Sequence, residues 1–307
     1  MRTIILAQGE NTRWLQSIAA WNPGYDIPGL ASLAPVAREQ MENQFVQASA
    51  RIKRIRDERL PKHLLPIGGE TNLGRTLRLA MRVGLPKPVV VAHQWYKEWL
   101  PANTNVYTYP EVGVMASSLL ALWPDKAEGV AVLYGDVVFG FRTLALMAMR
   151  LHDPEGDIQD LSTITYYKAD GTFDLERYRK TQIHPAGPVT SAFFGRLDKN
   201  LTTGKTDAEL CGFVISPGNH EWMRQVLAEL DERHKKDRYH PAKGLLWPWP
   251  IFRTFLKVGR GDPRDQVATG RFVLTDDYTD DCDSFPEYCQ FWPALERAAL
   301  EDPCLPL

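Results

Sequence analysis

Four groups of polar residues in the sequence could together act on a phosphorylated substrate. A glycine-containing loop ends in Arg13, and its backbone N–H groups can cradle phosphate oxygens while the guanidinium pairs with them. Asp136 follows an apolar run, where a carboxylate is costly to bury unless it pairs or binds a cation. Lys62 offers a compact positive charge that could neutralise a phosphoryl transition state. The fourth group is an acidic run made of Asp276, Asp277, Asp280, Asp281 and Asp283.

Carboxylates from the ends of two strands suit Mg²⁺, which takes one or two of them together with substrate phosphates. Each group also has a simpler interpretation. Asp136 could be a turn or helix-capping residue, and the acidic run could be a solvated loop that lends one carboxylate to a site. Phosphate chemistry is favoured because all four groups occur in one chain.

Short apolar runs are predicted to carry these groups at strand ends. Residues 4–7, 89–92 and 130–134 are such runs, bounded by turn residues, as expected for buried strands of a parallel sheet. Asn72 is a plausible cap for a helix over residues 73–83. Strands and helices that alternate through short turns predict a doubly wound α/β architecture. In such sheets, ligands bind beyond the carboxyl ends of the strands.

The second half of the chain is less regular but still predicts elements of the same layered fold. Residues 192–197 and 209–216 look like a pair of antiparallel strands. An amphipathic helix is expected over residues 220–235, and a last strand over residues 272–274. Since the sequence contains neither an internal repeat nor a linker, we expect a single domain over residues 1–307.

The composition limits the kinds of partner that the protein could bind. The chain has 307 residues, a net charge of −2 and a hydrophobic fraction of 44%, which is ordinary for a soluble globular protein. This charge gives no general attraction to nucleic acid or to an anionic membrane. No apolar run fits a signal peptide or a membrane span, and the four cysteines form no CxxC pair. We expect a cytoplasmic protein that binds neither nucleic acid nor membranes.

Five segments resemble motifs of the nucleotidyltransferases that make NDP-sugars and CDP-alcohols. Residues 6–13, LAQGENTR, resemble the LAAGxGTR signature, and residues 61–69, PKHLLPIGG, match the PKxLLPIxG block. Residues 134–139, YGDVVF, match the metal-binding GDxxF strand end, and residues 209–214 resemble the AExxG strand. Residues 281–288, DCDSFPEY, are closest to the late block of phosphocholine cytidylyltransferase-like members. The resemblance implies a Rossmann-like, glycosyltransferase-A-type mixed sheet.

The resemblance also implies a reaction: Mg²⁺-dependent transfer of NMP from an NTP to a sugar 1-phosphate or a phospho-alcohol such as phosphocholine. Arg13 and Lys62 would bind the NTP phosphates, and Lys62 would stabilise charge at the α-phosphorus. Asp136 and Asp283, assisted by Asp281, would hold Mg²⁺. An acceptor phosphate is ionised at neutral pH, so no general base is needed. The implied nucleotide-binding residues are Leu6, Ala7, Gln8, Gly9, Glu10, Asn11 and Ser117.

The sequence departs from the family pattern near the signature loop. Gln8 replaces an alanine, and Asn11 replaces a glycine, although Asn tolerates left-handed backbone geometry. The family has a much shorter connection between the loop and the lysine block. Residues 14–60 are therefore interpreted as an insertion that acts as a lid, an acceptor-specificity element or an oligomer contact.

An aromatic loop over residues 241–260 is the best candidate for the acceptor side of the site. Trp247 and Trp249 could stack on a sugar ring or attract a quaternary ammonium group. Lys205 could meet the acceptor phosphate. The alternatives are a hydrophobic cover over the sheet or a dimer contact for the loop, a solvated side chain for Lys205, and helix capping for Ser117.

Two other functions remain compatible with the sequence. A glycosyltransferase of similar fold would bind an NDP-sugar through a D-x-D motif, but Asp136 has no second Asp two residues away. A catalytically inactive nucleotide-binding homologue is the other alternative, and Gln8 and Asn11 are the best evidence for it.

Overall fold

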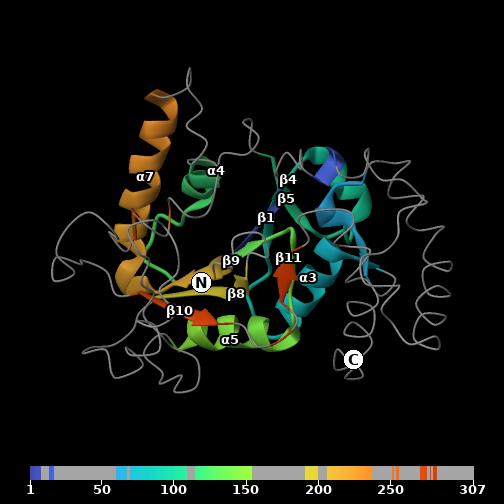
Figure 1. Cartoon of the computed structure of the whole chain (residues 1–307). Coiled ribbons are helices and arrows are strands. Elements are labelled where there is room, and N and C mark those ends of the chain that lie inside the picture. Colours follow the sequence, from blue (N-terminus) through green and yellow to red (C-terminus); the bar gives the residue numbers. More distant parts are fainter. Residues whose placement is uncertain are drawn as a thin grey trace, which may run out of the picture.

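The computed structural model describes the part of the chain that forms the sheet and its covering helices (Figure 1). The described residues are 1–7, 14–16, 60–67, 70–108, 115–153, 191–199, 206–236, 251, 254–255, 270–274, 277 and 279–281. At the centre lies a seven-stranded sheet with the order β10-β8-β9-β6-β1-β4-β5. Its strands are β1 (Arg2–Ala7), β4 (Val89–Ala92), β5 (Asn105–Tyr107), β6 (Val130–Tyr134), β8 (Ser191–Lys199), β9 (Thr206–Ile215) and β10 (Gly270–Leu274).

The chain reverses its direction of travel across the sheet between β1 and β6. From β1 it moves outward to β4 and β5, and then returns to place β6 on the other side of β1. All four of these strands are parallel, while β9 runs antiparallel to β6 and β8, and β10 is parallel to β8. Ligands of open α/β sheets bind at such a reversal, beyond the carboxyl ends of the strands.

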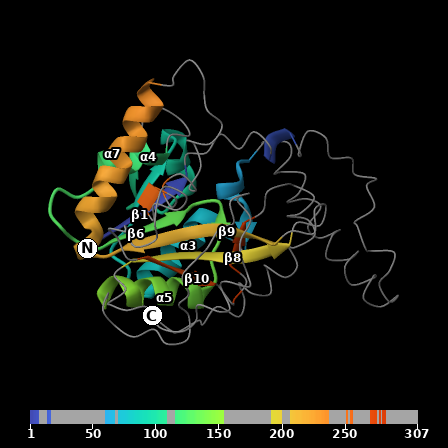
Figure 2. The ribbon, with the colours of Figure 1, turned by 60° about the vertical axis from the view of Figure 1, so that its left-hand side comes forward.

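Helices cover both faces of the sheet. Helices α4 (Met115–Leu122) and α7 (His220–Lys236) pack together on one face, and α3 (Asn72–Arg82) and α5 (Phe141–His152) cover the other (Figures 1 and 2). Burial on both faces explains why the central strands are continuously apolar: Ile4, Ile5, Val132 and Leu133 are fully buried. The doubly wound, Rossmann-like α/β mixed sheet predicted from the sequence is confirmed.

Short elements complete the described part of the chain. Two small antiparallel pairs join β2 (Pro66–Ile67) to β3 (Glu70–Thr71) and β7 (Val137–Val138) to β11 (Asp280–Asp281). The 3-10 helices are η2 (Lys62–Leu64), η3 (Gln94–Trp99) and η4 (Pro217–Asn219). No helix among the described ranges has the length and apolar character that a membrane span needs.

The cap of α3 differs from the sequence prediction. Thr71 caps the helix: its backbone is extended, and its Oγ1 accepts a hydrogen bond from the Gly74 N–H at 3.0 Å. The prediction that Asn72 caps this helix was therefore wrong. Asn72 is the first helical residue and is fully buried. Both residues are good capping types, and the interior offers partners for the Asn72 amide that no local pattern reveals.

The two ends of the segment interpreted as an insertion lie together. The indole N–H of Trp14 donates to the carbonyl oxygen of Leu60 at 2.8 Å, and both residues are buried. The described residues on either side of this segment are therefore in direct contact. Residues 17–59 lie outside the described residues, so the role of residues 14–60 as a lid or oligomer element stays a prediction.

Candidate functional site

The candidate site begins where the turn after β6 meets the end of β1. The Gly135 N–H donates to the Leu6 carbonyl oxygen at 2.7 Å. A Cβ built on Gly135 would lie 2.8 Å from the Cβ of Ala7 and 2.9 Å from the Leu6 oxygen, which is too close for any side chain. Glycine thus lets the Asp136 turn pack directly on the residues that lead into the signature loop.

Lys62 and Asp136 form an ion pair at this reversal point of the sheet. The Lys62 Nζ lies 2.6 Å from the Asp136 Oδ2, and the two side chains are 13% and 30% exposed. Burial alone would raise the pKa of Asp136, but the positive charge and hydrogen bond of Lys62, the neighbouring His63 and a backbone hydrogen bond together outweigh burial and hold that pKa below its ordinary value. The structure therefore brings together two of the three residues predicted to be catalytic, with the carboxylate ionised at neutral pH.

A histidine and a tyrosine that the sequence analysis missed stand beside this pair. His63 follows Lys62 in η2, and its Nδ1 lies 3.2 Å from the hydroxyl oxygen of Tyr96 in η3. Burial lowers the pKa of His63 to about 4, against the attraction of Asp136 for its proton. Burial also raises the pKa of Tyr96. Both groups are neutral at pH 7, so neither adds a charge to those of Lys62 and Asp136.

The late acidic run approaches the same place through its backbone. In the pair formed by β7 and β11, Asp281 lies opposite Val137 and Asp280 lies opposite Val138. Asp281 is therefore close in space to Asp136, more than a hundred residues earlier in the chain. The backbone pairing brings the two chain segments together, while the side chain of Asp281 lies outside the described residues and its role as a metal ligand stays a prediction.

Asp277, from the same acidic run, has a structural role. Its Oδ2 accepts from the Thr143 N–H at 2.9 Å, and its Oδ1 accepts from the Thr143 hydroxyl at 2.8 Å. Thr143 lies in the first turn of α5, whose capping residue Gly140 has no side chain to offer. Asp277 thus caps α5 from a distant segment and anchors the chain just before β11.

No group of three or more His, Cys, Asp and Glu side chains within the described ranges could hold a metal ion. Mg²⁺ needs fewer protein ligands, because one or two carboxylates plus substrate phosphates suffice. The ionised, partly exposed carboxylate of Asp136 beside the backbone of Asp281 fits that requirement. Mg²⁺ binding at these residues stays a prediction.

Ser117 has a partner other than a nucleotide. It is buried in α4, and its hydroxyl donates to the carboxylate of Asp231 in α7. Asp231 also pairs with Lys235, whose Nζ lies 2.7 Å from its Oδ2. These contacts fasten α4 to α7. A nucleotide contact from Ser117 stays a prediction, and it would have to share this hydroxyl with Asp231.

The described part of the aromatic loop supports the interpretation as a cover over the sheet. Ile251 and Phe255 are buried in the main hydrophobic core. The ring centroid of Phe255 lies 5.4 Å from that of Phe193 in β8, and its carbonyl oxygen accepts from the Trp222 indole at 2.9 Å. An acceptor role for the rest of the loop stays a prediction.

Several predicted site residues cannot be placed relative to Lys62 and Asp136. Leu6 and Ala7 end β1 beside the Asp136 turn, but the remainder of the signature loop lies outside the described residues. The residues that stay predictions for this reason are Gln8, Gly9, Glu10, Asn11, Arg13, Lys205, Trp247, Trp249 and Asp283.

Comparison with known proteins gives similar solved structures at low identity. No protein-family model and no curated protein matches the chain. A nucleotidyl transferase from Methanothermobacter has 13% identity and a TM-score of 0.48, over 96% of this chain and 97% of its own. A putative glucose-1-phosphate thymidylyltransferase from Bacillus anthracis has 10% identity and a TM-score of 0.45, over 100% and 97% of the two chains. The CTP:phosphocholine cytidylyltransferase of Streptococcus pneumoniae has 11% identity and a TM-score of 0.44, over 96% and 97%.

Nucleotidyltransferases are thus among the solved proteins to which this chain is similar.

Proposed function

We propose that the protein is a Mg²⁺-dependent nucleotidyltransferase, which transfers NMP from an NTP to a sugar 1-phosphate or a phospho-alcohol and releases pyrophosphate. The observation that supports this function best is the ion pair between Lys62 and Asp136, with 2.6 Å between Nζ and Oδ2. It lies at the carboxyl ends of two parallel strands, β1 and β6, where the chain reverses across the sheet. A ligand that enters there meets a cation and an ionised carboxylate side by side.

The proposed reaction requires little acid–base chemistry. An oxygen of the acceptor phosphate attacks the α-phosphorus, the bond to the bridging oxygen breaks, and pyrophosphate leaves with the bonding electrons. The attacking oxygen is already ionised at neutral pH, so the catalyst must position two anions and neutralise their charge. A site whose described histidine, His63, is buried and neutral agrees with this requirement.

The chain's own residues would divide this work. Lys62 carries its ammonium on a flexible four-carbon side chain, so it can turn from Asp136 to an oxygen of the α-phosphate. Asp136, with Asp281 and Asp283, would hold Mg²⁺. The bound ion would supply further neutralisation of the triphosphate charge. The turn at Gly135 keeps Asp136 against the end of β1, where the signature loop starts.

The test is a matrix of each NTP against sugar 1-phosphates and phosphocholine, with Mg²⁺ and detection of pyrophosphate. We expect pyrophosphate for one pair of substrates. Release of free NDP from an NDP-sugar would favour glycosyl transfer instead, and nucleotide binding without any product would favour an inactive homologue.

Two matched substitutions connect the activity to the site. Lys62→Met and Asp136→Asn should each reduce pyrophosphate release by at least about a hundredfold, because the first removes a cation from the reacting phosphates and the second removes a carboxylate that would hold Mg²⁺. Lys126→Met is the control, since Lys126 is exposed near the opposite end of β6. A Lys62→Met enzyme as active as the control would remove Lys62 from the mechanism.

A further inference from the structure

Asn72 holds the backbone on both sides of Asp136. Its side-chain Nδ2 donates to the carbonyl oxygen of Gly135 at 3.4 Å and to that of Val137 at 3.1 Å. The side chain is fully buried. A buried amide N–H group without a partner would carry a large desolvation cost, so the two bonds of Nδ2 tie the first residue of α3 to the turn that carries the carboxylate.

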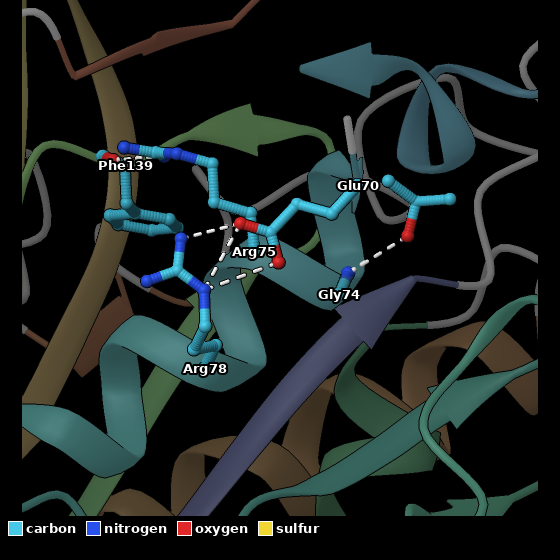
Figure 3. A network of polar contacts seen from close by, with 6 residues as sticks. Glu70, Gly74, Arg75, Arg78 and Phe139 are labelled. Atoms are coloured by element: carbon cyan, nitrogen blue, oxygen red, sulfur yellow. Dashed lines mark hydrogen bonds and ion pairs between the residues drawn. The ribbon is translucent and has the colours of Figure 1, made fainter. Parts of the chain in front are cut away.

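Arg75 extends this attachment along the same segment. Its Nη1 donates to the carbonyl oxygen of Phe139 at 2.7 Å, and its side chain is also fully buried (Figure 3). Arg78, which follows it on α3, instead pairs with Glu70 at the surface. The inward direction of Arg75 is therefore specific to its position next to the Asp136 segment.

The three carbonyl groups held by α3 belong to alternate residues, 135, 137 and 139. Residues 135 and 136 form a turn, but in the extended stretch from Val137 to Phe139 alternate carbonyl groups point to the same side, so Asn72 and Arg75 cover one edge of that stretch. The other edge pairs with β11 through Val138 and Asp280. The backbone around Asp136 is thus held from both sides, by a helix and by the late acidic strand.

Asn72 also connects this segment to the one that carries Lys62. Its backbone N–H donates to the carbonyl oxygen of Leu65 at 2.7 Å, directly after η2. One residue therefore bonds to both segments whose side chains meet in the ion pair between Lys62 and Asp136.

We propose that Asn72, with Arg75 beside it, is a positioning residue that holds Asp136 in the place where it binds the metal and faces Lys62. This inference rests on the proposed metal-dependent function. Asn72 contacts the carbonyl groups immediately before and after Asp136, whereas Arg75 contacts a carbonyl group three residues away. The loss of the Asn72 side chain should therefore weaken metal binding more than the loss of the Arg75 side chain.

The test compares Asn72→Ala with Thr71→Ala in the full-length protein. Thr71→Ala removes the helix cap and lowers the stability of the same end of α3 without removing any bond to residues 135–139. Arg75→Lys is a third variant, and Asn72→Ser replaces Asn72→Ala should that protein not fold. Mn²⁺ binding in the presence of a nucleotide is measured by titration calorimetry, and amide exchange of a peptide covering residues 134–140 is measured by mass spectrometry.

We expect Asn72→Ala to weaken Mn²⁺ binding by about tenfold or more, as losses of groups that orient metal ligands do, and to speed exchange in residues 134–140. Arg75→Lys should weaken binding less. Thr71→Ala should keep Mn²⁺ binding and amide exchange within about twofold of the wild-type values, although this variant should melt at a lower temperature than the wild type.

Equal effects of Asn72→Ala and Thr71→Ala, at a similar loss of melting temperature, would overturn the positioning role and leave the proposed function standing. Unchanged exchange in Asn72→Ala would overturn it as well. Absence of Mn²⁺ binding in the wild type would instead overturn the proposed function and, with it, the role of Asn72 toward a metal. The exchange measurement would still report whether Asn72 holds the segment.

Discussion

Gly135→Ala is the most direct perturbation of the contact between β1 and β6. The added Cβ would lie 2.8 Å from the Ala7 Cβ and 2.9 Å from the Leu6 carbonyl oxygen, so backbone as well as side chain must move apart. Overpacking of this kind costs about 1–3 kcal/mol. Alanine also lowers the conformational entropy of the unfolded chain, which stabilises the variant by about 0.4–1 kcal/mol. We expect a net loss of roughly 1–2 kcal/mol, which corresponds to roughly 1.5–3 °C in melting temperature for a chain of 307 residues.

The same displacement should reduce activity more than it reduces stability. It separates the residues that lead into the signature loop from Asp136, and a misplacement of about 1 Å can cost about a hundredfold in rate. We therefore expect kcat for pyrophosphate release to fall by roughly 10- to 100-fold. Thermal unfolding and steady-state kinetics at saturating NTP and acceptor measure the two effects on one preparation.

Gly129→Ala provides a matched control at the other end of β6. Its added Cβ would meet the Leu151 Cδ1 at 2.9 Å, whereas the nearest backbone atom is 3.6 Å away. The end of a leucine side chain can rotate, so this variant should be tolerated and fully active. Wild-type kcat in Gly135→Ala, or an equal loss of kcat in Gly129→Ala at equal stability, would contradict this expectation.

Three further predictions concern contacts around the site. Asp277→Ala should lower stability by about 1–2 kcal/mol by removing the cap of α5, and the loss should appear in urea unfolding. Asp231→Asn should cost about 1–2 kcal/mol at pH 7. Burial opposes ionisation of Asp231, but hydrogen bonds from Lys235 and Ser117 lower its pKa below the ordinary 3.8. The ionised carboxylate therefore stabilises the fold above pH 3.8, and the difference in free energy of unfolding between Asp231→Asn and the wild type should shrink as the pH falls below 3.8. Replacing residues 17–57 by a short Gly/Ser linker should leave a folded protein by circular dichroism, because Trp14 and Leu60 already meet.

The sequence predicts those parts of the site that depend on local pattern. Asp136 follows a strand of uninterrupted apolar residues, and the structure places it at the carboxyl end of β6. Lys62 lies in a block with recognisable spacing, and the structure brings it to Asp136. Both positions could be predicted because strands that are buried on two faces occur in the sequence as continuous apolar runs.

Residues whose role depends on distant partners could not be predicted in this way. Thr71 and Asn72 are equally good capping residues by type. The carbonyl groups that draw Asn72 inward belong to residues 135 and 137. Asp277 looks like any member of an acidic run, and its capping role depends on Thr143 at the start of α5. His63 gave no signal beyond its place in the lysine block, because its neutral state results from burial beside Tyr96.

A double substitution tests whether the ion pair between Lys62 and Asp136 contributes to the stability of the fold or only to the activity. Replacing a largely buried pair with apolar residues of similar volume is often neutral or stabilising, whereas removing one partner leaves the other charge uncompensated. Lys62→Met with Asp136→Leu should therefore melt within about 3 °C of the wild type and lack activity. Asp136→Leu alone should melt lower, because the 13% exposed ammonium of Lys62 loses its partner. A double variant less stable than both single variants would show that the pair is retained for the fold.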